Sequence, residues 1–275
     1  MLVTVPLKFH IPVALEALEL GKHALVEKPF APTVDEARQA VDLAEKQGLT
    51  LAVSQNYRFF PAPQAVRKLV ASGELGAVGT VHVDFRKHVT REKGGHRHFT
   101  LLDPLLVDMA IHHFDLMRYV LDQEPTGITC RSWNPVWSPF EGDAAGSAVV
   151  EFERGMVADW RGSWVSPAPP TNWGGEWHME FERGEVIWTT RGDLGTTAND
   201  RVTIRPAGGT ERTLTLPDMP LNGRAGALTA FAEAIRTGNP LDPDISGRSN
   251  LMTLAMAQSA VGSAAEGKRF PLPVA

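Results

Sequence analysis

The chain has 275 residues, of which 43% are apolar and 21% charged, with a net charge of −5 and an isoelectric point near 6.0. This content is sufficient for a packed core, and the length allows one large domain or two ordinary ones. The weakly acidic balance argues against nucleic acid and anionic membranes as partners, which leaves small molecules. With a single cysteine, Cys130, and neither a membrane-length apolar run nor a signal-peptide pattern, we expect a cytoplasmic globular protein.

The first part of the chain alternates short apolar runs with amphipathic helical patterns. Strands are expected at residues 2–5, 24–26 and 51–53. The first helix ends near Gly21, which suits a left-handed cap, and Thr33 with Glu36 forms a capping box that opens the second. Strand, helix, strand, helix, strand is typical of a parallel sheet with covering helices. We predict a partial Rossmann-type domain, of the α/β class, over residues 1–56.

The pattern changes after this segment. Val81, Val83 and Phe85 alternate with polar residues, and further strand-like runs follow as far as about residue 216, separated by turns that contain glycine. We therefore predict an α+β domain over residues 57–275 with a large, mostly antiparallel open sheet. Two closing helices are expected, with inward faces formed by Leu228, Phe231, Ala232 and Ile235 in one and by Leu251, Leu254, Ala255 and Gln258 in the other.

The sequence Glu27-Lys28-Pro29 directly follows the second predicted strand. Lys28 therefore lies at the carboxyl end of a parallel strand, where open α/β sheets form their ligand crevices. This position suits a catalytic lysine. The alternative is an ordinary solvated lysine in a turn, since lysine is common on protein surfaces.

A second candidate cluster consists of Asp108, His112 and Asp115, spaced by four and three residues within a helical pattern. An α-helix places all three on one face, whereas His113 points about 100° away from His112. A carboxylate one turn from a histidine fixes its ring and raises its basicity, as a general base requires. The alternative is a solvent-facing polar stripe without function.

These two segments carry a resemblance to a known family. Residues 21–30, GKHALVEKPF, and residues 108–115, DMAIHHFD, resemble the two signatures of the glucose-fructose oxidoreductase, inositol dehydrogenase and rhizopine-catabolism (Gfo/Idh/MocA) family. The likeness runs through the whole chain, including the junction at 56–59 and the closing helix at 246–248. It implies a hydride transfer between NAD or NADP and a hydroxyl carbon of a sugar or cyclic polyol. It also implies a homodimer or homotetramer formed through the sheet of the second domain.

The resemblance also implies roles for individual residues. Lys28 would contact the reacting hydroxyl and the nicotinamide ribose, His112 would move the hydroxyl proton, and Asp108 would hydrogen-bond that hydroxyl or its neighbours. Asp115 would orient His112 or bind a further sugar hydroxyl. The expected cofactor-binding residues are Pro6, His10, Glu27, Lys28, Asn56 and Arg58.

The glycine-rich turn that binds the pyrophosphate in this family has no counterpart here, since no G-x-G-x-x-G follows a strand. We therefore expect the chain to lack the N-terminal dinucleotide-binding segment. Either the start at Met1 is internal to a longer protein, or the chain is a true short form. The alternative function is a non-catalytic relative that binds a small molecule or acts in regulation.

Two further groups of residues suggest ligands. Trp164 and Trp173 are candidates for contact with a sugar, although most tryptophans are expected in the core or at subunit interfaces. A metal site in a sugar isomerase or hydrolase is conceivable, but the spacings match no zinc signature and we expect no metal. That site would draw on His10, His96, His98, Asp103, Asp108, His112 and His113.

Overall fold

The computed structural model describes residues 1–89 and 99–272. These residues form two compact units, the first comprising 1–59 and 219–255 and the second 60–218 and 256–275. The sequence analysis assigned 219–255 to the second domain, whereas the structure includes them in the first unit. The physical reason is visible in the main chain, where the amide of Val53 donates to the carbonyl of Ile245 at 2.8 Å.

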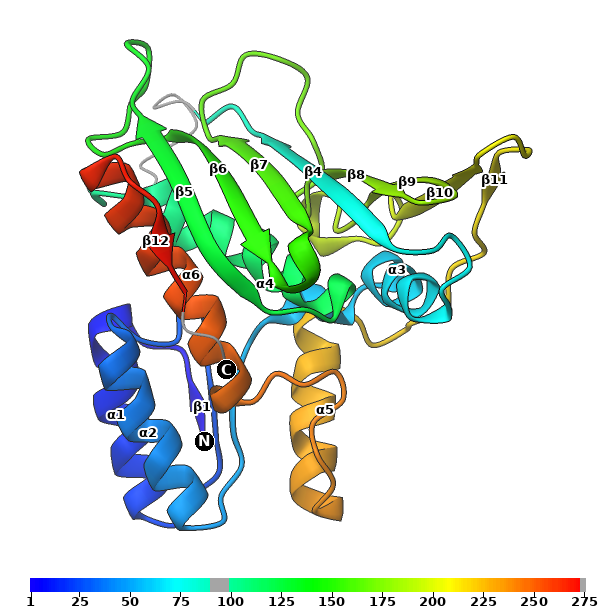
Figure 1. Ribbon diagram of the computed structural model, residues 1–275. Helices are drawn as coiled ribbons and strands as arrows, with labels where there is room; N and C mark the ends of the chain where they lie inside the picture. The colour runs from blue at the N-terminus through cyan, green and yellow to red at the C-terminus, as the bar shows by residue number, and fades with distance from the viewer. Residues whose placement is uncertain (90–98, 273–275) are drawn as a thin grey trace. The chain divides into compact units, whose positions relative to one another are not determined.

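The first unit is the predicted α/β domain (Figure 1). Its three strands are parallel in the order β1-β2-β3, and β2 is central. The elements are β1 (Leu2–Val3), η1 (Leu7–Phe9), α1 (His10–Glu19), β2 (Ala24–Val26), α2 (Val34–Lys46), β3 (Leu51–Val53), η2 (Asn56–Phe59) and α5 (Gly223–Thr237).

Alternating strand residues bury their side chains on opposite faces of this small sheet. One core contains Val26 and Val53 with residues of α1 and α2, and the other contains Leu25 and Ala52 with residues of α5 such as Phe231. This alternation is the two-residue period of a strand that is buried on both sides. The strands are therefore apolar throughout, as the sequence indicated.

The predicted helix ends of this unit are confirmed, but one predicted helix face is wrong. The Thr33 hydroxyl accepts the amide of Glu36 at 3.2 Å, and Gly21 adopts the left-handed φ of 69°. In α5, however, Leu228 is 49% and Ile235 37% exposed. The buried residues are Gly223, Gly226, Ala227, Phe231 and Ala234. Gly226 lies so close to the Phe59 side chain that a Cβ would come within 2.9 Å of it, so small residues set the inward face.

The second unit is built on a nine-stranded sheet, seen edge-on in Figure 1. The strand order is β11-β10-β9-β8-β4-β7-β6-β5-β12, and only the central pair β4 and β7 is parallel among these strands. The strands are β4 (Val78–Arg86), β5 (Pro125–Trp133), β6 (Ala145–Phe152), β7 (Val157–Ser163), β8 (Glu176–Phe181), β9 (Gly184–Thr189), β10 (Arg201–Pro206), β11 (Arg212–Thr213) and β12 (Phe270–Pro271). The predicted large, mostly antiparallel sheet is confirmed.

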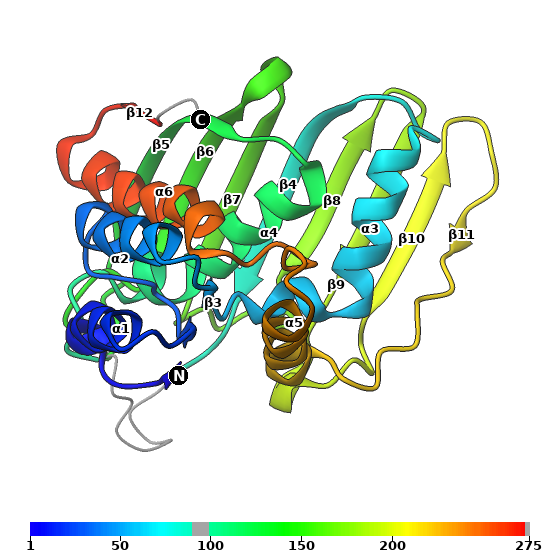
Figure 2. The same ribbon diagram turned by 90° about the horizontal axis from the view of Figure 1, so that it is seen from below.

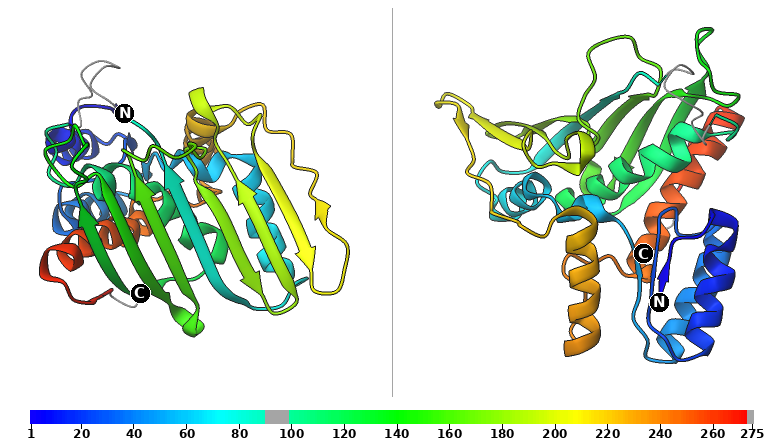
Figure 3. Two further views of the ribbon diagram at one scale, coloured as in Figure 1. Left: turned by 90° about the horizontal axis from the view of Figure 1, so that it is seen from above. Right: turned by 180° about the vertical axis from the view of Figure 1, so that it is seen from behind.

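Helices cover one face of this sheet and leave the other face open (Figures 2 and 3). The covering elements are α3 (Pro61–Ser72), the π-helical turn η4 (Leu105–Ala110), α4 (Ile111–Leu121) and the end of α6 (Gly247–Glu266). Trp160, Trp177 and Trp188 are fully buried beneath them. Within the described ranges, no helix has the length and apolar character needed to cross a membrane.

Candidate active site

The first group of candidate residues, in the first unit, lies in the turn that follows β2. Lys28 comes two residues after Val26, the last residue of the central parallel strand, and the Lys28–Pro29 peptide bond is cis. The Glu27 carboxylate accepts two hydrogen bonds. One comes from the main-chain amide of Lys28 at 3.0 Å, and the other from the guanidinium of Arg224 at 3.2 Å. Glu27 therefore fixes the main chain from which the Lys28 side chain extends.

His10 ties the ends of two strands together. Its Nδ1 lies 2.8 Å from the carbonyl oxygen of Pro29, and its Nε2 lies 2.9 Å from that of Val5. The ring is 3% exposed. Because main-chain carbonyls contact both ring nitrogens, His10 shapes this edge of the sheet through the backbone.

The segment after β3 adds three buried polar side chains at the same edge. Asn56 and Arg58 are each 5% exposed, and the Arg58 guanidinium donates to the carbonyl oxygen of Asp244 at 2.6 Å. Gln55 is 1% exposed, and neither of its amide atoms has a hydrogen-bond partner among the described residues. Sequence reasoning missed Gln55, because an isolated glutamine beside a strand gives no signal of burial.

A second group of candidate residues, in the second unit, is the set Asp108, His112 and Asp115. The structure modifies the prediction that one regular α-helical face holds all three. Asp108 lies in the π-helical turn η4, while His112 and Asp115 lie in α4. His112 is 5% and Asp115 1% exposed, so these polar groups are buried and are not a solvent-facing stripe. Wider turns of this kind are frequent at functional sites.

His113, beside His112, links α4 to the sheet and to a loop. The indole N–H of Trp160 donates to His113 Nδ1 at 3.1 Å, so Nδ1 accepts and Nε2 carries the proton, which it donates to the carbonyl of Trp173 at 3.1 Å. Burial lowers the pKa of His113 to about 4, against a smaller opposing effect of its bond to Trp173. The imidazole is therefore neutral near pH 7, with one tautomer fixed by two partners.

This burial makes the stability of the fold sensitive to acid. The unfolded chain protonates His113 near its ordinary pKa of 6.5, and the folded chain only near 4. The contribution of neutral His113 to the free energy of unfolding is fully present above pH 6.5. It is lost as the pH falls towards 4, and the total loss is about 3 kcal/mol. We expect His113→Gln to remove this part of the pH dependence when denaturant unfolding is measured at about pH 7 and about pH 4.5. Parallel pH dependences in the two proteins would contradict it.

The two candidate tryptophans occupy different environments. Trp164 is 2% exposed and packs edge-on against Phe140 at 5.7 Å and against Trp173 at 6.4 Å between ring centres. Trp173 is half-buried, with its indole N–H donating to Asp193 at 3.0 Å. Trp164 therefore supports Trp173 from within the core, and Trp173 is the better placed of the two to meet a ligand.

The residues of the conceivable metal site are not brought together. His96 and His98 lie outside the described residues. Among the residues that the structure describes, no three histidine, cysteine or acidic side chains are grouped so as to hold a metal ion. Asp103 lies near Asp143, and its pKa is raised mainly by burial and further by that second carboxylate. The described residues therefore provide no set of ligands for a metal-dependent isomerase or hydrolase.

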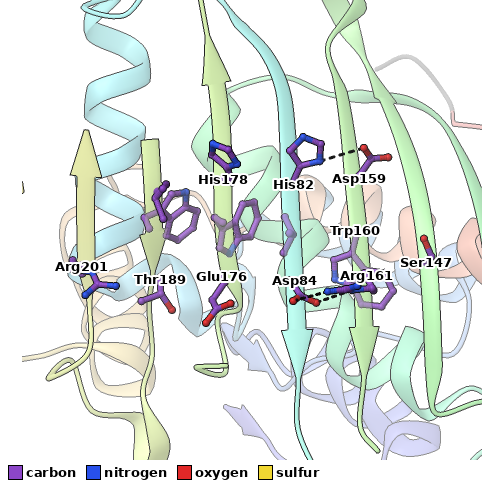
Figure 4. A pocket seen from close by; sticks show the side chains of 14 residues that line it. His82, Asp84, Ser147, Asp159, Trp160, Arg161, Glu176, His178, Thr189 and Arg201 are labelled. Carbon is purple, nitrogen blue, oxygen red and sulfur yellow. Dashed lines mark hydrogen bonds and ion pairs between the residues drawn. The ribbon is translucent and has the colours of Figure 1, made fainter. Parts of the chain in front are cut away.

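The open face of the nine-stranded sheet carries a broad hollow of about 560 Å³, lined by both charged and apolar side chains (Figure 4). Its side chains form cross-strand ion pairs, such as Asp84 of β4 with Arg161 of β7 at 2.9 Å and His82 with Asp159 at 3.3 Å. Next to these, Arg86 pairs with Glu176 of β8 at 2.9 Å. Charges of both signs thus alternate across the middle of this face.

Two family models match the chain. The model described as "Oxidoreductase family, NAD-binding Rossmann fold" matches residues 1–55, and the model described as "GFO/IDH/MocA C-terminal domain" matches residues 64–187. The first match does not support the expectation that the chain lacks the N-terminal segment, because the NAD-binding model covers the opening residues. The signatures in residues 21–30 and 108–115 each lie inside a matched range.

Individual relatives agree with these matches. An uncharacterised protein of Sinorhizobium fredii is 28% identical over 67% of this chain and 52% of its own length. The 1,5-anhydro-D-fructose reductase of Ensifer adhaerens is 27% identical over 95% of this chain and 76% of its own. The chain thus spans about half the length of the first relative. Among solved structures, an aldose-aldose oxidoreductase of Caulobacter crescentus shares the fold, with a TM-score of 0.83 at 23% identity over 98% of this chain and 78% of its own.

Proposed function

The chain matches both domains of the GFO/IDH/MocA oxidoreductases, and on that premise we propose that it transfers a hydride between NAD(P) and a hydroxyl carbon of a sugar or cyclic polyol. The observation that carries the proposal is the position of Lys28. It lies in the turn at the carboxyl end of the central parallel strand, where such sheets form their ligand crevices. The reductase relative, whose name specifies a sugar derivative, supports the substrate class.

The candidate residues of each unit are assigned separate chemical roles in this proposal. A nicotinamide dinucleotide, when bound, accepts the hydride from the carbon or returns it. The Lys28 ammonium stabilises the negative charge that develops on the reacting oxygen. His112 takes or gives the proton of that hydroxyl, Asp108 accepts a hydrogen bond from a neighbouring hydroxyl, and Asp115 orients His112 or binds a further hydroxyl. Trp173 contacts the sugar, and Trp164 supports it.

The polar groups of the first unit fit a dinucleotide. A buried amide without partners is costly, so the two unpaired groups of Gln55 at the carboxyl edge of β3 are best explained by a ligand that hydrogen-bonds them. We assign the cofactor to this edge, with Pro6, His10, Glu27, Lys28, Asn56 and Arg58 around it. His10, Glu27 and Arg58 act here by fixing the main chain through the contacts described above.

The test of this function is cofactor binding by the whole chain. We expect titration with NADH or NADPH to show saturable binding at micromolar concentration in calorimetry. The matched variant Gln55→Leu keeps the side-chain size but removes the amide nitrogen and the amide oxygen. We expect it to weaken binding about tenfold. Failure of the wild-type chain to bind either dinucleotide would contradict the oxidoreductase proposal and favour a binding or regulatory protein.

For the open face of the second unit we propose pairing between copies of this chain. The support is that this face carries charges of both signs around the hollow, so that the same surface of a second copy could meet it with opposite charges in a symmetric dimer. Analytical ultracentrifugation of the whole chain checks this, and a species that stays monomeric at all concentrations would contradict it.

A further inference from the structure

The loop between β5 and β6 carries an exposed tryptophan, Trp137, that the proposed hydride transfer does not use. Trp137 is 61% exposed. The only polar atom of its side chain, the indole nitrogen, donates to the main-chain carbonyl of Val165 at 2.9 Å. The remainder of the indole consists of carbon, so the ring presents an apolar aromatic surface to solvent.

Hydrogen bonds within the loop hold it in a defined conformation. The amide of Ser138 donates to the carbonyl of Pro135 at 2.8 Å. The side-chain amide of Asn134 donates to the carbonyl of Phe140 at 2.7 Å. Trp137 therefore stands in a loop that is ordered before any ligand arrives, and this lowers the conformational entropy that is lost on binding.

The loop leaves the sheet at the same rim as the segment that contains Trp164 and Trp173. Trp133, the last residue of β5, stands opposite Ala145 of β6, and Ala145 stands opposite Ser163, the last residue of β7. The β5–β6 loop and the segment that follows β7 therefore begin side by side at one rim of the sheet, within a single unit (Figure 1).

A row of packed rings connects this loop with Trp173. Phe140 packs edge-on against Trp164 at 5.7 Å between ring centres, and Trp164 packs against Trp173 at 6.4 Å. Val165, which accepts the N–H of Trp137, directly follows Trp164 in the chain. Trp164 is 2% and Val165 1% exposed. Trp137 and Trp173 are thus anchored on the same buried pair of residues.

The exposed ring and its surroundings suit a sugar. A sugar ring combines an apolar C–H face with hydroxyls at its edge, so it requires an aromatic plane with polar groups nearby. The same loop provides two exposed polar side chains, Asn134 before Trp137 and Glu141 after it. One sugar ring covers one indole, so a ligand that contacts both Trp137 and Trp173 needs a second ring.

We propose that Trp137 forms an outer sugar-binding subsite, so that the substrate class is a glycoside with two or more sugar rings. The ring that reacts lies against Trp173, and the ring linked to it stacks on the exposed face of Trp137. This inference rests on the proposed function for the place of the inner ring. It concerns binding alone and requires neither cofactor nor turnover.

The experiment compares single sugars with disaccharides by calorimetric titration of the whole chain without cofactor. D-glucose and D-galactose are the single sugars, and maltose, cellobiose and lactose are the disaccharides, so that both α and β linkages are included. We expect at least one disaccharide to bind about tenfold more tightly than either single sugar. The proposal is overturned if no disaccharide binds more tightly than the single sugars.

Variants of two exposed tryptophans make the test specific. Trp137→Ala is expected to bring the affinity ratio of disaccharide to single sugar close to one, with the single-sugar affinity unchanged. Trp137→Phe keeps an aromatic plane and should retain part of the preference. Trp133→Ala is the matched control and should keep the wild-type ratio, because Trp133 is also exposed, at 46%, but lies at the end of β5. Equal losses for both kinds of sugar in Trp137→Ala would indicate a structural role and overturn the assignment.

A protein partner is the competing occupant of this surface, since Val136, next to Trp137, is fully exposed. Sedimentation of the wild-type chain and of Trp137→Ala tests this alternative. A dimer that is lost in the variant, with sugar affinities unchanged, would assign the surface to a second copy and overturn the subsite. Conversely, a disaccharide preference in a chain that never oxidises or reduces a sugar would refute the proposed hydride transfer and leave the subsite intact.

Discussion

His112→Ala is expected to lower kcat about a hundredfold or more, because it removes the group that moves the hydroxyl proton, and general acid–base groups typically contribute at least this much. The variant should fold, since alanine suits the interior of α4, which runs from Ile111 to Leu121. The measurement is the initial rate of NAD(P)H formation at saturating cofactor with the sugar that gives the highest wild-type rate.

Two further readouts separate catalysis from folding in this variant. The wild-type pH profile of kcat should show a titrating limb that the variant lacks, because the essential base has been removed. The control is His82→Ala. It removes a histidine of β4 from the face of the nine-stranded sheet that α4 does not cover, and its kcat should be unchanged. A His112→Ala enzyme with near-normal turnover would exclude His112 as the base.

Lys28→Ala should cause a loss of similar size in kcat/KM, about a hundredfold, because the cation that stabilises the reacting oxygen is absent. Lys28→Arg keeps the positive charge but presents a planar group on a longer side chain, so we expect it to restore only part of the activity. Steady-state kinetics with varied sugar and cofactor give both values.

The control for this position is another lysine near the same strand. Lys22 precedes β2 and is exposed, whereas Lys28 follows the strand at its carboxyl end. Lys22→Ala should therefore leave kcat/KM unchanged. If Lys28→Ala turned over like the Lys22 variant, the turn after β2 would not be part of the catalytic site.

The first unit was largely predictable from the sequence because its signals are local. Three short apolar runs, the capping pair Thr33 and Glu36 and the cap at Gly21 each depend on neighbouring residues, and the structure reproduces them. The inward face of α5 was not predictable in this way. Its contacts depend on Gly226 approaching Phe59 from a distant part of the chain, so the apolar stripe through Leu228 and Ile235 gave the wrong face.

The second unit shows a different limit. Alternation predicted a large sheet, but the order of its nine strands and the parallel pairing of β4 with β7 depend on contacts that no local pattern encodes. The spacing of Asp108 and His112 predicted one α-helix, whereas the structure has the wider turn η4, which packs against β6 and β7. The burial of His112 and Asp115 agreed with the expectation that these polar groups turn inward.

The contacts of Trp173 with Lys87, Arg191 and Asp193 could not be predicted, although Trp173 itself was singled out. Lys87, Arg191 and Asp193 stand in unremarkable sequence, and only the folded sheet brings their strand ends together. His113 was interpreted only as pointing away from the site of His112. Its link to Trp160 and Trp173 depends on the tertiary packing of α4 against β7 and the loop.

The parallel pairing of β4 with β7 has a consequence for how such proteins diversify. Because the two strands run in the same direction, the segments that follow Arg86 and Ser163 leave the sheet at the same rim. The main chains of Lys87 and Val89 stay bonded to the second segment through Ser163, Trp164 and Ser166, so change is expected only beyond these bonds. On the proposed function, we expect loops exchanged beyond this point to alter substrate preference while the helix that carries His112 stays unchanged.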